Sequence, residues 1–265
     1  MSATGAAPRA PSTGLAGKVG LVLGIANEHS IAAGCAARFA DAGARFVATY
    51  LNEKAKPHVE AVTSGLPCDR LLACDLREDG ALEAVFDAVR AQYGRLDFVL
   101  HSIAYAPRDD LHGRIADSSA AGFAQAMDIS CHSFIRCARL AEPLMSEGGA
   151  LLAVTFYGSQ RVVPHYGLMG PVKAALESSV RYLAAELGAK RIRVHALSPG
   201  PIATRAASGI ADFDAMLEEA EHRAPERQLV TIDDVGALAA FLASDAAARL
   251  TGTIVPVDAG ESVMA

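Results

Sequence analysis

Short runs of apolar residues alternate with longer stretches of mixed polarity along most of this chain. The run 19–23 contains no polar side chain, which is typical of a strand covered by helices on both faces of a parallel sheet. Runs of similar length predict six further strands, at 46–50, 71–74, 98–101, 150–155, 193–197 and 253–257.

The stretches between these strands predict helices, of which the longest are 31–42, 78–93, 172–187 and 231–243. Gly43 and Gly94 stand directly after the first two, where a glycine commonly ends a helix. Thr231 is the predicted N-cap of the last one, and the acidic Asp233 and Asp234 suit the positive end of its dipole. Strands that alternate with helices form a parallel sheet with right-handed crossovers.

The pattern contains no internal repeat and no long linker, so we expect one α/β domain over residues 16–265. Residues 1–15 are rich in alanine, serine, glycine and proline and lack the apolar core of a secretory signal, which predicts a disordered N-terminal tail. In open parallel sheets, ligands bind beyond the carboxyl ends of the strands. The loops that follow the predicted strands are therefore the place to search for a site.

Composition narrows the possible functions. The net charge of -6 and the pI of about 5.7 argue against a broad nucleic-acid-binding face. No uncharged apolar run reaches the roughly 18 residues that a membrane span needs, so no membrane partner is expected. The five cysteines include no C-x-x-C pair, which favours reduced thiols and a cytoplasmic location. Neither cysteines nor histidines have the spacing of metal ligands, so we assign no metal site.

The loop after the first predicted strand has features of a phosphate-binding turn. Gly24 follows the strand, and Ser30 stands at the start of the next helix. The N–H groups at a helix start can bind a pyrophosphate, with the positive end of the helix dipole behind them. The pattern is not G-x-G-x-x-G, because residue 26 is alanine. The alternative is a plain strand-to-helix turn in which Gly34 serves packing.

The ends of the second and third predicted strands bear on the choice of nucleotide. An acidic residue after the second strand commonly binds the ribose 2′-hydroxyl, and Glu53 stands slightly late for this role. No arginine precedes it in this loop to bind a 2′-phosphate, so NADH is favoured over NADPH, although Lys54 and Lys56 keep NADPH open. Asp75 can accept a hydrogen bond from adenine, with Leu76 packed on the ring; a helix N-cap is the other reading of Asp75.

Tyr166 and Lys173 follow the fifth predicted strand and are seven positions apart, which places them on one face if both are helical. A lysine near a phenol can lower its pKa or bind a ribose hydroxyl beside it. A phenol in this position can donate a hydrogen bond to an oxygen that becomes negative during a reaction. The alternative is a half-buried aromatic ring and a solvated lysine.

Five motifs together resemble the short-chain dehydrogenase/reductases. They are Gly24-x5-Ser30-Ile-Ala, His101-Ser-Ile-Ala104, Tyr166-x6-Lys173, Gly200-Pro-Ile-x-Thr204 and Val257-Asp258. The x6 spacing departs from the common Y-x3-K pattern of that superfamily. It is similar to a divergent branch, the bacterial enoyl-[acyl-carrier-protein] reductases, and segments 161–177, 200–210 and 231–245 also resemble this branch. The resemblance covers about residues 15–260.

The resemblance implies a Rossmann-type three-layer sandwich, with a seven-stranded parallel sheet in the order 3-2-1-4-5-6-7 and helices on both faces. It also implies NADH-dependent reduction of trans-2-enoyl thioesters, carried by acyl carrier protein, in type II fatty acid synthesis. The hydride would pass to the β-carbon of the thioester, and the expected assembly is a homotetramer.

The resemblance assigns roles to individual residues. Tyr166 and Lys173 would be catalytic, with Tyr166 donating to the thioester carbonyl oxygen and Lys173 binding the nicotinamide ribose. The cofactor would contact Gly24, Ser30, Ile31, Leu51, Asp75, Leu76, Ser102, Ile103, Lys173, Ile202 and Thr204. The substrate would contact Ala106, Phe156, Tyr166, Met169 and Ala206.

One position departs from the family pattern. The family usually has a second tyrosine ten positions before Tyr166, where this chain has Phe156, followed by Tyr157. In an extended segment Tyr157 would point to the other side. Two other functions on the same fold stay open: a carbonyl reductase or alcohol dehydrogenase of secondary metabolism, and a non-catalytic dinucleotide-binding paralogue.

Overall fold

The structure, a computed structural model, describes residues 14–204 and 213–264. Seven parallel strands form one sheet in the order β3-β2-β1-β4-β5-β6-β7. They are β1 (Val19–Leu23), β2 (Arg45–Tyr50), β3 (Cys68–Ala73), β4 (Phe98–His101), β5 (Gly149–Val154), β6 (Ile192–Pro199) and β7 (Thr253–Val257). The predicted fold class and strand order are confirmed.

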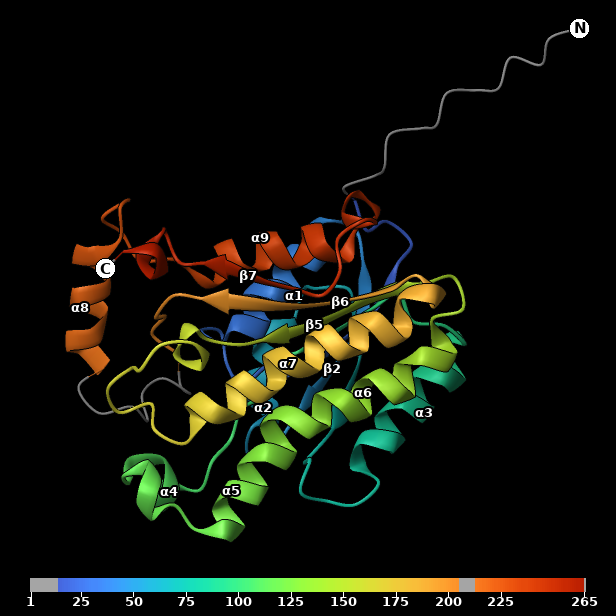
Figure 1. Cartoon of the computed structure of the whole chain (residues 1–265). Helices are drawn as coiled ribbons and strands as arrows, with labels where there is room; N and C mark the ends of the chain where they lie inside the picture. Colours follow the sequence, from blue (N-terminus) through green and yellow to red (C-terminus); the bar gives the residue numbers. More distant parts are fainter. Residues whose placement is uncertain (1–13, 205–212, 265) are drawn as a thin grey trace, which may run out of the picture.

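Helices cover both faces of the sheet (Figure 1). They are α1 (Ile31–Asp41), α2 (Lys56–Thr63), α3 (Ala81–Tyr93), α4 (Arg108–His112), α5 (Ala120–Met127), α6 (Ser133–Ala141), α7 (Met169–Leu187), α8 (Phe213–Arg223) and α9 (Ile232–Ala243). One buried core lies between the sheet and α3, α6 and α7. A second lies between the opposite face and α1, α2 and α9. The strands are buried on both sides, which explains their continuous apolar runs.

Two glycines allow α1 and α9 to pack closely. A Cβ added at Gly34 would lie 2.2 Å from the carbonyl oxygen of Ile232, and one added at Gly236 would lie 2.5 Å from the carbonyl oxygen of Gly34. Any side chain at either position would force the helices apart. Gly34 is therefore a packing residue, as the alternative interpretation of the first loop proposed.

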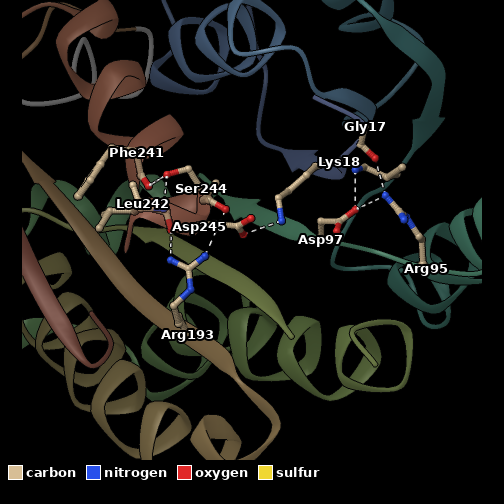
Figure 2. Close-up of polar contacts among 12 residues, drawn as sticks. Gly17, Lys18, Arg95, Asp97, Arg193, Phe241, Leu242, Ser244 and Asp245 are labelled. Atoms are coloured by element: carbon tan, nitrogen blue, oxygen red, sulfur yellow. Dashed lines mark hydrogen bonds and ion pairs between the residues drawn. The ribbon is translucent and has the colours of Figure 1, made fainter. Parts of the chain in front are cut away.

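Polar contacts close the amino end of the sheet (Figure 2). The buried Arg193, near the start of β6, donates from its guanidinium to the carbonyl oxygens of Leu242 and Ala243 at the last turn of α9. A cation at this place satisfies carbonyl groups that the helix leaves unpaired and opposes the negative end of its dipole. Lys18, which precedes β1, bonds Asp245 beyond the same helix at 2.9 Å.

A second contact group at this end joins β1 to β4. The Asp97 carboxylate, directly before β4, accepts from the N–H of Val19 at 2.8 Å and pairs with Arg95 at 3.1 Å (Figure 2). The starts of the two central strands are thus held together by a side chain as well as by the sheet ladder.

The predicted tail, residues 1–15, lies mostly outside the described residues. Its last residue does not fit the prediction: Leu15 is fully buried, and its N–H donates to the carbonyl oxygen of Ala42 at 2.7 Å. The core takes up this leucine because it packs beneath the end of α1, so the folded part of the chain begins before residue 16. The five cysteines are free thiols. Within the described ranges, no helix is both long and apolar enough to span a membrane.

Candidate active site

The first loop turns at Gly24, which has a φ of +103°. A Cβ at this position would lie 2.1 Å from the carbonyl oxygen of Ser102, so a side chain is excluded on both counts. The Ser30 hydroxyl donates to the carbonyl oxygen of Asn27 at 2.6 Å and accepts from the N–H of Ala26 at 3.3 Å. Ser30 therefore shapes the loop from within and lines neither of the cavities described below.

A cavity of about 550 Å³ lies at the carboxyl ends of the strands, beside this loop. Its volume lies within the range of small-molecule binding sites. Eight of the predicted cofactor residues line it: Gly24, Ile31, Leu51, Asp75, Leu76, Ser102, Ile103 and Lys173. They come from the segments that follow β1, β2, β3 and β4 and from α7, which explains how residues so distant in sequence share one wall.

A second cavity, of about 300 Å³, adjoins the first. Its lining is mostly apolar and includes the predicted residues Ala106, Phe156, Tyr166, Met169, Ile202 and Thr204. Four residues line both cavities: Ile31, Ala104, Tyr105 and Thr155. Ala206, the remaining predicted substrate residue, lies outside the described residues.

The Asp75 carboxylate is held in the wall of the larger cavity by Arg77. It accepts from the N–H of Arg77 at 3.0 Å and from its guanidinium Nε at 2.9 Å. These bonds with the guanidinium lower the pKa of Asp75, so it is an ionised acceptor at neutral pH. The alternative interpretation as an N-cap is wrong, because α3 begins after Gly80.

The ionisable residues after β2 fall into two groups. Glu53 accepts from the Tyr50 hydroxyl at 3.0 Å and pairs with Lys56 at 3.8 Å, and neither charge lines the cavity. Lys54 and His58 do line it. Glu53 is therefore engaged by its neighbours in the same loop, whereas Lys54 stays at the cavity wall.

Lys173 is buried in α7, so the alternative interpretation of a solvated lysine is wrong. Its Nζ donates to the carbonyl oxygen of Val154, the last residue of β5, at 2.8 Å. Burial lowers the pKa of Lys173 to about 8, and Cys131 and Glu177 offset part of this effect. Lys173 thus carries a proton at neutral pH and loses it slightly above.

Tyr166 lies in the turn before α7 and not on the helix, so the interpretation that it shares a helical face with Lys173 is wrong. Its ring meets that of Phe156 edge to face, with centroids 4.9 Å apart. A Cβ at Gly158 would lie 2.6 Å from the Tyr166 ring, so this glycine makes room for it. Burial, and then the charge of Glu177, raise the pKa of Tyr166, so the phenol is a neutral donor. Of the two roles that the sequence offered for Lys173, lowering the pKa of Tyr166 is therefore contradicted.

Tyr157 does not supply the hydroxyl that Phe156 lacks. Its hydroxyl donates to Oε1 of Glu261 at 3.1 Å, and the same oxygen accepts from the Arg223 guanidinium in α8. Tyr157 lines neither cavity. Its side chain ties the loop after β5 to the C-terminal segment and to α8, while Phe156 lines the smaller cavity.

Several residues in the cavity walls were missed in the sequence. Thr49 in β2, His58 in α2 and Arg77 in the loop after β3 line the larger cavity. A systematic reading of the carboxyl ends of the strands would have found Thr49 and Arg77. Glu177, buried next to the site, had no such signal, because a glutamate in a helix is commonly solvated.

Comparison with known proteins identifies the family. The sequence profile of enoyl-(acyl carrier protein) reductase matches residues 24–262. The chain is 46% identical to the enoyl-[acyl-carrier-protein] reductase [NADH] 2 of Rhizobium meliloti strain 1021, over 93% of this chain and 92% of that protein.

Solved structures agree. The enoyl-(acyl-carrier-protein) reductase of Anaplasma phagocytophilum, in complex with NAD, superposes with a TM-score of 0.90 at 42% identity, over 94% of this chain and 95% of that one. The Bacillus cereus enoyl-acyl carrier protein reductase, solved with NADP+ and an indole naphthyridinone, gives a TM-score of 0.92 at 42% identity, over 95% and 98%. This chain belongs to the enoyl-(acyl carrier protein) reductase family.

Proposed function

We propose that this chain is an NADH-dependent enoyl-[acyl-carrier-protein] reductase, which converts trans-2-enoyl thioesters to saturated acyl thioesters in type II fatty acid synthesis. The observation that carries the proposal is the pairing of two adjoining cavities. One holds a buried lysine and an ionised aspartate, and the other is apolar and holds the neutral phenol of Tyr166. Relatives above 40% identity bear this activity in their names.

The larger cavity fits a dinucleotide. The close approach of Gly24 to Ser102 leaves a turn whose backbone can meet a pyrophosphate, with Ile31 at the start of α1. Asp75 and Leu76 would hold the adenine, and Leu51 the adenosine ribose. Ser30 would act by shaping the turn.

At the other end of the cofactor, Lys173 would bind the nicotinamide ribose, and Ser102 with Ile103 would line the path to the ring. Ile202 and Thr204 would meet the carboxamide and phosphates from the smaller cavity. NADH, when bound, supplies the hydride for the reduction.

The smaller cavity suits an apolar acyl chain with one polar end. Ala106, Phe156 and Met169 would contact the chain, together with Ala206. Tyr166 would donate its hydrogen bond to the thioester carbonyl oxygen, which gains negative charge as the double bond is reduced. Because the raised pKa keeps this phenol protonated, the donor is available across the physiological pH range.

The test is oxidation of NADH and of NADPH by the purified protein, with enoyl and ketoacyl thioesters over a series of chain lengths. We expect turnover with NADH and an enoyl thioester. Turnover with only the ketoacyl thioester would assign a carbonyl reductase. Binding of NADH without turnover on any thioester would assign a non-catalytic paralogue.

We also propose a cytoplasmic homotetramer. The free cysteines fit a reducing compartment. Exposed apolar side chains, among them Tyr182 in α7 and Val263 near the C-terminus, fit burial between subunits. Light scattering coupled to size exclusion should give four times the 27.5 kDa chain mass.

A further inference from the structure

We propose that Glu177 is a positioning residue of the active site, which fixes the loop after β5 against α7 and keeps Lys173 protonated for cofactor binding. The inference rests on the proposed function and assigns a task to a buried carboxylate that touches neither cavity.

Glu177 accepts three side-chain hydrogen bonds from one loop, the loop after β5. Its Oε1 accepts from the Thr155 hydroxyl at 2.8 Å and from the Ser159 hydroxyl at 2.5 Å, and its Oε2 accepts from the Gln160 amide at 3.2 Å. Three donors converging on one buried group suit an ionised carboxylate, which can only accept. Glu177 is 4% exposed, so water does not substitute for these donors.

The same loop places the groups that face the substrate. Phe156 lies between Thr155 and Ser159, and Gly158 makes room for the ring of Tyr166. Holding the loop from both of its ends therefore fixes the wall against which Tyr166 packs. Loss of these bonds would let Phe156 and Tyr166 shift without removing either of them.

Glu177 also stands one helical turn after Lys173. Lys173 interacts electrostatically with His101 from β4, with Cys131 from the π-helical turn before α6, and with Glu177 from α7 itself. His101 is neutral because burial lowers its pKa to about 3, and burial raises the pKa of the Cys131 thiol, so it is neutral as well. Glu177 is thus one of two acidic groups that favour the protonated form of Lys173, and it is the one on the same helix.

The experiment measures NADH binding by nicotinamide fluorescence between pH 6 and 10, which needs no turnover. In the parent, affinity should fall as the pH rises through about 8, because Lys173 loses its proton there. Glu177→Gln keeps the shape and removes the charge, and it should lower the midpoint by about one pH unit. Glu177→Asp keeps the charge and should retain the parental midpoint.

Two matched variants separate charge from packing. Cys131→Ala removes the other group that raises the pKa of Lys173, so it should also lower the midpoint but leave the KM for the enoyl thioester at the parental value. Ser159→Ala removes one donor to Glu177 while the carboxylate stays. The KM for the enoyl thioester should therefore rise several-fold, whereas the midpoint of the pH titration should stay at the parental value. If Glu177→Gln does not fold, this variant decides the positioning role.

An unchanged midpoint in Glu177→Gln would overturn the charge role. Parental kcat and KM in Ser159→Ala would overturn the positioning role. A parent that binds NADH but reduces no enoyl thioester would refute the proposed function and leave the pH test intact.

Discussion

The two ends of the sheet use polar side chains in opposite ways. At the amino end, Arg193, Lys18 and Asp97 form hydrogen bonds or ion pairs with neighbouring segments, so their polar groups have partners within the protein (Figure 2). At the carboxyl end, Asp75 and Lys173 both line the larger cavity. The same strands thus end in a closed face at one side and an open cleft at the other.

This difference separates stability from activity. A polar group whose partners are all within the protein contributes to the free energy of unfolding, whereas one that faces a cavity is available to a ligand. Substitutions at the amino end should therefore change unfolding and leave kinetics alone, and those at the carboxyl end should do the reverse.

The largest expected effect is that of Tyr166→Phe. Loss of the phenolic donor should lower kcat by about 100- to 1,000-fold, the usual cost of removing one donor to a developing oxyanion. NADH affinity and the melting temperature should stay close to those of the parent, because the ring and its contact with Phe156 remain. The measurements are NADH oxidation with a crotonyl thioester and fluorescence titration; full activity would refute the assigned role.

Lys173→Ala should weaken NADH binding by about 10- to 100-fold, since a charged hydrogen-bond donor is lost from the site. The buried ammonium is costly to keep, so the free energy of unfolding should change less than the size of the deletion suggests. Titration with NADH at pH 7 checks the first point and urea unfolding the second. Parental NADH affinity in Lys173→Ala would show that Lys173 does not bind the nicotinamide ribose.

At the closed end, Arg193→Met should lower the free energy of unfolding by about 2 kcal/mol, because two buried carbonyl groups at the end of α9 lose their donor. The value of kcat/KM should stay within about twofold. Lys18→Met, at the partly exposed pair with Asp245, is the control and should cost about 0.5 kcal/mol. A large kinetic effect of Arg193→Met would contradict the separation of the two ends.

Stability should fall in mild acid. Burial lowers the pKa of His101 to about 3 and that of His195 to about 4, below the value of about 6.5 in the unfolded chain. The unfolded state then binds protons that the folded state does not, so stability is fully present above pH 6.5 and is lost as the pH falls toward 4. Between pH 7 and 5 the cost is up to about 2 kcal/mol per histidine.

Urea unfolding at pH 7 and pH 5 measures this effect, and His101→Gln or His195→Gln should each reduce the difference between the two pH values. His101 lies at the carboxyl end of β4 and His195 inside β6, so the pair compares a residue beside the cleft with one away from it. Equal pH dependence in parent and variants would show that neither histidine is responsible.

The wall of the larger cavity could be predicted well from the sequence. Gly24, Asp75 and Ser102 follow apolar runs, and the carboxyl ends of parallel strands meet at one edge of a sheet. The apolar runs themselves follow from burial on both faces, so their positions in the chain already give the strands. The local pattern and the topology therefore have the same cause, which is the burial of the strands on both faces of the sheet.

The orientation of the polar side chains depended on packing that no local pattern encodes. Tyr166 lies outside the helix that carries Lys173, and the hydroxyls of Ser30 and Tyr157 turn toward the protein instead of the cavities. The burial of Glu177 likewise could not be predicted from the local sequence. The sequence thus determined the sheet, the family and the residue types of the site, because these follow from burial and from short motifs. Only the tertiary structure decided which polar side chains line the cavities, since that depends on which of them form hydrogen bonds with neighbours in the protein.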